Sequence, residues 1–168
     1  MVARSAVGVL EIEDYQRIFR FLERVHESRS LDDFKEQVLD GLAREFGLRN
    51  STWFTGASYG ALFEDPEPML FGRTVTMFDE YRSAWCKHDT FRLREARATL
   101  ERSAAMSANE LTSLPVESSM YLHDFLGRRG IADVGTMYIR HSGGHSLIGL
   151  FTEHTTISGR DMSSLRIL

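Results

Sequence analysis

The chain has 168 residues, of which 42% are hydrophobic and 26% charged, and its formal net charge is −4. This size fits one globular domain whose core is large enough to fold without disulfides, and the single Cys86 excludes an internal one. The negative charge makes the chain a poor candidate for binding a phosphate backbone, and no stretch is long and apolar enough to span a membrane. The apolar run of residues 1–10 is too short for a signal peptide, so we expect a cytoplasmic protein, which suits the lone cysteine.

Two amphipathic helices are predicted first. The first should run from about Asp14 to Glu27 and bury one apolar stripe. The residues of that stripe are Tyr15, Ile18, Phe19, Leu22 and Val25. Ser30 followed by Asp33 opens the second helix, and Gly47 ends it. Its predicted buried residues are Phe34, Val38, Leu42 and Phe46.

Short strands follow the two helices. Residues 51–55 are rich in β-formers and close at Gly56, and residues 61–63 could return as a short strand. Residues 64–68 form an acidic loop with two prolines, and residues 69–71 are a further strand candidate.

A helix with an aromatic face is predicted next. Thr76 and Asp79 have the spacing of a capping box that marks its start. Four residues share one helix face, and Asp89 follows on the next turn. They are Phe78, Tyr81, Trp85 and His88. Such a wall could line a pocket for a small apolar molecule with one or two polar atoms, and the alternative is an ordinary core face.

The remaining elements include the clearest β-signal. Residues 91–102 are rich in arginine with weak helical periodicity, and residues 109–114 indicate a short helix or turn. A better helix runs from Val116 to Arg129 and ends at Gly130. We expect its inward residues to be Met120, Tyr121 and Phe125, with Leu122 as a further candidate.

Residues 131–140 and 146–152 flank a turn in which Gly143 and Gly144 supply the positive φ angles of a hairpin. Ser158 and Asp161 cap a final helix containing Met162 and Leu165. No stop signal follows, so we expect this helix to continue beyond Leu168, with a frayed natural terminus as the alternative. The order of elements predicts an α+β fold, an α/β/α sandwich whose antiparallel sheet is covered by helices.

The chain resembles the N-terminal GAF/PAS-like sensor domain of actinobacterial LuxR-type transcription regulators. Residues 80–91 are similar to that family's aromatic-rich helix, which ends in Asp-Pro and an apolar residue, with Thr90 in place of the proline. Residues 121–131 resemble its Tyr-x-x-Phe-Leu-x-x-x-Gly segment, and residues 157–168 resemble the approach to its linker. The resemblance implies that residues 1–168 are a single sensor domain that forms a homodimer. A DNA-binding helix-turn-helix domain would lie beyond Leu168 and is absent from this chain.

The predicted function is the sensing of a small hydrophobic ligand, which would shift a dimer or linker geometry. Aromatic side chains would enclose the ligand, and Asp89 or Tyr81 would satisfy its polar atoms. The candidate wall residues are Trp53, Phe54, Tyr81, Trp85, Tyr121, Phe125, Tyr138 and Phe151. In the acyl-homoserine lactone sensors of the resembling family, a Tyr, a Trp and an Asp hold the ligand's polar end, and Tyr81, Trp85 and Asp89 match these residue types. The alternative is a ligand-free dimerisation module, which a closed core between Trp85 and Tyr121 would favour.

Catalysis, metals and cofactors have weaker support, and we expect no enzyme activity. His141 and His145 bracket the hairpin turn, but without a metal-binding motif we interpret them as a solvated pair. His88 as a haem ligand lacks a supporting motif, and Cys86 lacks a second cysteine to resolve an oxidised thiol. A basic cluster is interpreted as a solvated face, with an anion or partner contact as the alternative. It comprises Arg92, Arg94, Arg97 and Arg102.

Overall fold

The structure, a computed structural model, describes residues 8–168. Residues 1–7, which make up most of the segment interpreted above as too short for a signal peptide, lie outside the described residues. Within residues 8–168 one five-stranded antiparallel sheet has the strand order β2-β1-β5-β4-β3. The strands are β1 (Asn50–Gly56), β2 (Met69–Phe71), β3 (Ala105–Ser107), β4 (Asp133–His141) and β5 (Gly144–Thr152). The predicted α+β sandwich is confirmed.

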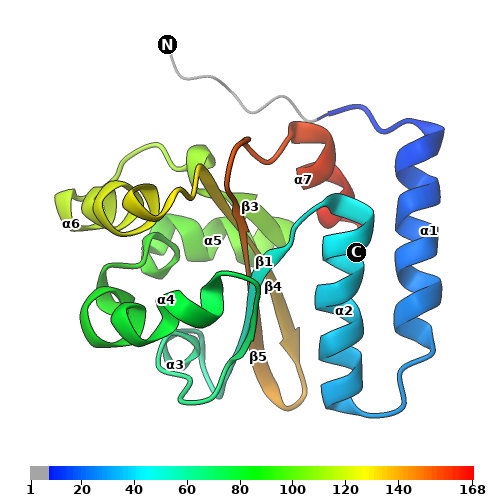
Figure 1. Cartoon of the computed structure of the whole chain (residues 1–168), viewed down its shortest axis with the longest axis horizontal. Helices are drawn as coiled ribbons and strands as arrows, with labels where there is room; N and C mark the ends of the chain where they lie inside the picture. Colours follow the sequence, from blue (N-terminus) through cyan, green and yellow to red (C-terminus); the bar gives the residue numbers. More distant parts are fainter. Residues whose placement is uncertain (1–7) are drawn as a thin grey trace.

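Helices cover both faces of the sheet (Figure 1). One layer contains α1 (Ile12–His26), α2 (Leu31–Phe46) and α7 (Gly159–Leu165). The opposite layer contains α3 (Tyr59–Leu62), α4 (Thr74–Glu80), α5 (Arg94–Ser103) and α6 (Val116–Met120). No helix among residues 8–168 combines the length and the hydropathy that a membrane crossing requires.

Strand alternation divides the interior into two cores, because successive side chains of a strand point to opposite faces of the sheet. In β1 the ring of Phe54 packs toward α3 and α4, whereas the ring of Trp53 packs in the core beneath α1 and α2. In β5, Leu147 and Phe151 join the first core, and Ile148 and Leu150 join the second. The two cores therefore serve different purposes: one anchors α1, α2 and α7, and the other surrounds the candidate site.

The predicted stripe of α1 is only partly buried. Ile18 and Phe21 lie inside, whereas Tyr15, Phe19 and Leu22 are exposed by 47%, 64% and 44%. The helix is turned in this way because Asp14 is also buried, and its carboxylate is neutralised by Arg160 of α7. The exposed apolar residues form a face that nothing within residues 8–168 covers.

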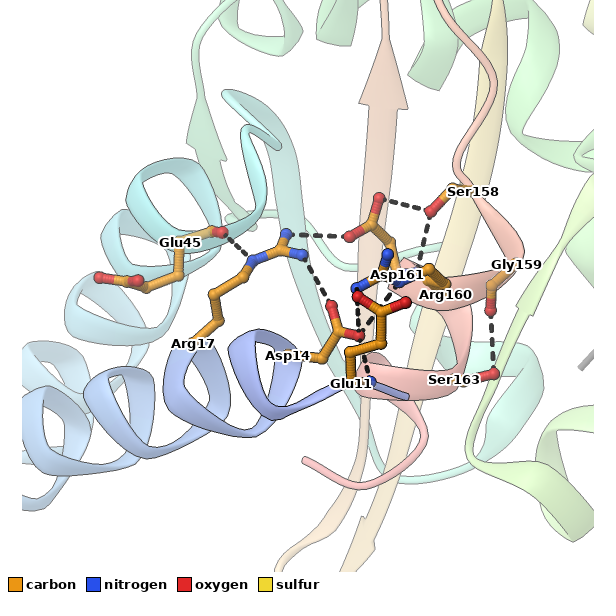
Figure 2. A network of polar contacts seen from close by, with 9 residues as sticks. All are labelled: Glu11, Asp14, Arg17, Glu45, Ser158, Gly159, Arg160, Asp161 and Ser163. Atoms are coloured by element: carbon orange, nitrogen blue, oxygen red, sulfur yellow. Dashed lines mark hydrogen bonds and ion pairs between the residues drawn. The ribbon is translucent and has the colours of Figure 1, made fainter. Parts of the chain in front are cut away.

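A polar network joins the starts of α1 and α7 to the end of α2 (Figure 2). Arg160 donates from Nη2 to Asp14 Oδ2 at 2.7 Å, and Arg17 donates from Nη2 to Asp161 Oδ1 at 2.9 Å. The Nε of Arg17 donates to the carbonyl oxygen of Glu45, near the C-terminus of α2, at 2.7 Å. These contacts fix α7, the last described helix, against the first two.

Several local predictions were wrong. Residues 61–63, expected as a strand, belong to the short helix α3 and its end, because the Ser58 hydroxyl caps that helix at the amide of Ala61. The helix α4 begins at Thr74 and not at Thr76, whose hydroxyl donates to the carbonyl of Arg73. Met120, expected to point inward, is exposed.

The predicted β-hairpin is confirmed. The predicted last helix is present as α7, but it ends at Leu165 with its C-cap at Arg166 and does not run on through Leu168 as expected. The hairpin closes through Ser142 and Gly143, and only Gly144 of the two glycines has a positive φ, of 129°. The hydroxyl of Ser158 accepts from the amide of Asp161 at 3.0 Å and caps α7.

Candidate functional site

A cavity of about 40 Å³ lies between the sheet and the layer of α3 to α6. Its walls are aromatic and aliphatic, with four polar side chains among them. The lining residues are Thr52, Phe54, Phe63, Thr74, Met77, Phe78, Tyr81, Asp89, Phe91, Tyr121, Phe125, Val134, Thr136, Leu147, Gly149 and Phe151, of which Thr52, Thr74, Asp89 and Thr136 carry short polar groups.

Two tyrosines reach the cavity from unusual helical turns. Tyr81 follows α4 and begins a π-helical segment that ends at Trp85, and the amide of Cys86 bonds to the Tyr81 carbonyl. Tyr121 follows α6 and begins a second π-helical segment that ends at Leu126. Wide π-helical turns shift side chains relative to a regular α-helix and occur frequently at functional sites. Both tyrosines are buried, at 7% and 1% exposure.

Asp89 is the charged centre of the site. It caps a short 3₁₀ turn, Thr90–Arg92, and its Oδ1 accepts from the amide of Phe91 at 2.9 Å. Its Oδ2 accepts from the Tyr81 hydroxyl at 2.8 Å. The carboxyl group is therefore held by its own turn and by the first π-helical segment, with one side toward the cavity.

Burial shifts the titration of this group and its neighbours. Desolvation raises the pKa of Asp89, although the hydrogen bonds from Phe91 and Tyr81 oppose the rise. Desolvation also raises the pKa of Tyr81 and of Tyr121, and the nearby charge of Asp89 adds to both shifts. Both phenols consequently stay neutral and can donate hydrogen bonds. The acceptor beside them is Asp89, whose ionised form is destabilised by burial.

Thr52 of β1 is another polar residue of the cavity lining, on the side that the sheet forms. Its hydroxyl is buried and has no hydrogen-bond partner among the described residues. Gly149 lies directly opposite in the register of β1 and β5, and a β-carbon there would approach the Thr52 hydroxyl to 2.5 Å. The glycine therefore keeps the space beside this hydroxyl open.

The cavity is small for a ligand, because typical small-molecule sites measure about 300–1,000 Å³. Aromatic side chains occupy most of the surrounding space: the ring centroids of Tyr81 and Tyr121 are 6.2 Å apart, and those of Tyr121 and Phe125 are 5.7 Å apart. Phe78 is the one lining side chain of the cavity that is not fully buried. Phe78 is therefore the lining ring nearest to the surface.

The structure brings five of the eight predicted site residues to this cavity: Tyr81, Asp89, Tyr121, Phe125 and Phe151. Phe54, which was also expected in the wall, lines the cavity as well. Trp53 lies on the opposite face of the sheet, since it is adjacent to Phe54 and strand side chains alternate. It cannot therefore share a wall with Phe54.

Trp85 and Tyr138 lie on the same side of the sheet as the cavity, but they do not line it. Trp85 stacks on Phe125 at 5.6 Å between ring centroids, and its indole donates to Glu80 at the surface. Tyr138 packs on Tyr59, and its hydroxyl bonds His145 Nδ1 at 2.6 Å. Trp85 therefore supports the wall through Phe125, whereas Tyr59 and His145, the partners of Tyr138, lie outside the lining.

Three further lining residues, Thr52, Thr136 and Gly149, were not predicted as site residues. The alternation of β1 and the pairing of β1 with β5 would have indicated Thr52 and Gly149 once Phe54 was taken as a wall residue. The three-residue strand β3 was also missed, because such a short strand depends on its pairing with β4.

The histidines and the cysteine that were considered as metal, haem or redox residues do not form a cluster. His141 bonds Ser146 and His145 bonds Tyr138, so the two histidines do not share a partner. Among residues 8–168 no three His, Cys, Asp or Glu side chains are grouped as metal ligands. The thiol of Cys86 donates to the carbonyl of Arg82.

Comparison with known proteins finds solved structures that share this fold. No family model matches the chain, and no curated protein matches its sequence. The ligand-binding domain of VqsR from Pseudomonas aeruginosa is similar in structure, with a TM-score of 0.54 and 13% identity over 91% of this chain and 95% of that one. The N-acylhomoserine lactone-dependent LuxR-family transcription factor CepR2 from Burkholderia cenocepacia has a TM-score of 0.54 and 10% identity over 94% of this chain and 88% of that one. At these identities the likeness establishes a shared fold.

Proposed function

We propose that this chain is the ligand-sensing domain of a LuxR-type transcription regulator and that it binds a small hydrophobic molecule. The domain would act in the cytoplasm and carry out no catalysis. A DNA-binding domain beyond Leu168 would read out the bound state. The shared fold with the VqsR and CepR2 structures supports the regulator class. The GAF-like and actinobacterial parts of the sequence resemblance stay predictions.

The single observation that carries the proposal is the buried Asp89, which is the one charged group in the lining of a mostly apolar cavity. A carboxyl group at 8% exposure, with a raised pKa, is costly to keep in a core. If this region were only a structural core, an apolar residue at position 89 would stabilise it at least as well as Asp89 does. A ligand that donates a hydrogen bond to Asp89 and accepts one from Tyr81 or Tyr121 would give the carboxyl group a function.

The small volume of the cavity places a condition on this function. A guest larger than a few water molecules requires the aromatic rings to separate, and Phe78 is the ring whose movement disturbs the core least. We therefore infer that the free domain is the contracted state and that the ligand selects an expanded one. Such a difference between the two states is what a sensor needs to pass a signal to another domain.

The proposed signal passes from the cavity through β5 to α7 and α1, which lie on the other face of the sheet. Phe151 of β5 lines the cavity, and Ile148 and Leu150 of the same strand pack in the core with Met162 and Leu165 of α7. Movement of β5 on ligand binding would therefore reach α7 directly. The ion pairs from α7 to Asp14 and Arg17 would carry it to α1 (Figure 2).

The exposed face of α1 supports the proposed homodimer. Ile12, Tyr15, Phe19 and Leu22 recur at spacings of three, four and three, which is the seam pattern of packed helix pairs. An antiparallel pair of α1 helices would cover these four side chains.

The same face favours the alternative function, a ligand-free dimerisation module. Under this alternative the 40 Å³ cavity is a packing defect and the apolar face of α1 is the only functional surface. The two functions differ in their response to small molecules, because a module without a ligand site gains no stability from any of them.

Thermal unfolding of the domain against a panel of small amphipathic molecules tests the proposed function. The panel should contain amides, lactones and esters with apolar bodies of graded size. A true ligand at 100 times its dissociation constant should raise the melting temperature by about 5–10 °C for a domain of this size. A uniform absence of stabilisation, together with an unchanged dimer, would favour the dimerisation module.

A further inference from the structure

A second hollow, of about 270 Å³, lies on the surface beside the first turn of α5. Its lining comprises Tyr59 and Gly60 of α3, Phe63, and the three arginines Arg92, Arg94 and Arg97. None of these lining residues is acidic. The hollow is separate from the central cavity, although Phe63 lines both.

Two of the arginines are held over aromatic rings. The guanidinium carbon of Arg92 lies 5.1 Å from the ring centre of Phe63, and that of Arg97 lies 5.3 Å from the ring centre of Tyr59. Both rings are buried, and the Tyr59 hydroxyl donates to the carbonyl of Phe91 at 2.5 Å, which fixes the Tyr59 ring. Cation–π contact orients a guanidinium group without neutralising its charge. The rings therefore hold these two cations in place and leave their N–H edges free.

The surrounding acids neutralise this charge only in part. Glu64 lies 3.9 Å from Arg92 and its side chain is 72% exposed, so this pair is weak. Glu101 bonds the Nε of Arg97 at 2.9 Å and leaves the terminal amino groups of that guanidinium free. Arg94 has no ion-pair partner among residues 8–168. Three partly unsatisfied guanidinium groups thus converge on one hollow.

We propose that this hollow binds the phosphate group of a small phosphorylated molecule. Guanidinium groups match the geometry of phosphate oxygens through paired N–H donors, and a phosphate offers enough oxygens for three such groups. The first turn of α5 has no side-chain cap at Leu93, so the positive end of that helix adds to the attraction. A carboxylate carries one negative charge on two oxygens, so a phosphate ester, with nearly two charges on three oxygens, matches three guanidinium groups better.

The direct test is a titration of the domain with phenyl phosphate, followed by ³¹P NMR at constant ionic strength. We expect saturable binding in the millimolar range, as suits an open surface site. A parallel titration with inorganic phosphate distinguishes the two sources of the same chemistry. Tighter binding of phenyl phosphate identifies an ester as the ligand, and tighter binding of inorganic phosphate identifies the free ion.

Matched variants make this test specific. Arg94→Gln should weaken phenyl phosphate binding at least about fivefold, because it removes one charged donor from the hollow. Arg102→Gln removes the same charge from another exposed position of α5 that does not line the hollow, and binding should stay within about twofold. Equal losses in the two variants would show general charge attraction and overturn the proposal. An absence of saturation in the wild-type protein would overturn it as well.

A substitution at Gly60 gives an independent check. A β-carbon at Gly60 meets no atom within 4 Å, so Gly60→Ala should keep both the fold and phosphate binding. Gly60→Glu places a carboxylate at the edge of the hollow and should abolish binding while the melting temperature stays close to that of Gly60→Ala. Retained binding in Gly60→Glu would contradict the proposed location.

Discussion

At the scale of single residues, the site depends on the contact between Tyr81 and Asp89. The Tyr81 hydroxyl donates to Asp89 Oδ2 at 2.8 Å, and the Tyr121 hydroxyl lies close enough to the same carboxyl group to lower the pKa of Asp89 by hydrogen bonding. A buried acceptor that loses its donor bears the full cost of desolvation. This pair therefore links the stability of the free domain to the chemistry of the cavity.

Replacing Tyr81 with Phe should lower the free energy of unfolding by about 1–3 kcal/mol, because Asp89 Oδ2 loses its donor. Urea denaturation measures the change. Tyr59→Phe is the matched control, since it also removes one buried hydroxyl, but Tyr59 does not line the cavity and its hydroxyl donates to the backbone carbonyl of Phe91 and not to Asp89. Both variants should be destabilised, but only Tyr81→Phe should lose the ligand-induced rise in melting temperature. An equal loss of ligand response in both would contradict a specific role for Tyr81.

The pH dependence of stability should reveal the buried carboxyl group. Burial raises the pKa of Asp89 in the folded state above the ordinary value of 3.8. Ionisation of Asp89 therefore opposes folding, and the wild type should lose stability relative to Asp89→Asn as the pH rises from about 3.8 through the folded pKa. Parallel urea titrations of the two proteins across this range measure the difference. A difference that moves in the opposite direction would mean that Asp89 is stabilised as the anion.

At the scale of elements, α1 has two different faces. Its inner face carries Ile18 and Phe21 together with the buried Asp14, and the ion pair with Arg160 connects it to α7. Its outer face carries four large apolar side chains in the spacing of a helix-pair seam. One helix thus combines the proposed dimer contact with a direct link to the end of the described chain.

Phe19→Glu should weaken the proposed homodimer at least about tenfold, because Phe19 lies in the middle of the exposed face of α1. Sedimentation equilibrium measures the dissociation constant. The monomer should keep its free energy of unfolding to within about 0.5 kcal/mol, since this side chain is 64% exposed. Val116→Glu, at an exposed position of α6, is the matched control and should leave association unchanged. A dimer that survives Phe19→Glu would exclude this face as the contact.

At the scale of the whole molecule, elements with strong local signals could be predicted from sequence. The second helix, the hairpin and the last helix were found from Ser30, Gly47 and Ser158 and from the turn glycines. Features set by distant partners could not. The orientation of α1 depends on the pairing of Asp14 with Arg160, 146 residues away, and β3 depends on β4.

In the candidate site, too, residues with a local sequence signal could be predicted, whereas features that depend on tertiary packing could not. Helical spacing found Tyr81, Asp89, Tyr121 and Phe125, because these residues follow helices whose periodicity is visible in the sequence. Trp53 was misplaced because its neighbour Phe54 takes the cavity side of β1, and only the packing of the two layers decides which side is which. The cavity volume could not be predicted, because it depends on how the aromatic rings pack.

The most direct test of the central claim is a crystal structure of the domain with the molecule that raises its melting temperature most. The account predicts ligand density against Asp89 and Tyr81, a displaced Phe78 ring, and a cavity enlarged toward the size of ordinary ligand sites. Density elsewhere on the protein, with the rings around Asp89 unmoved, would contradict it.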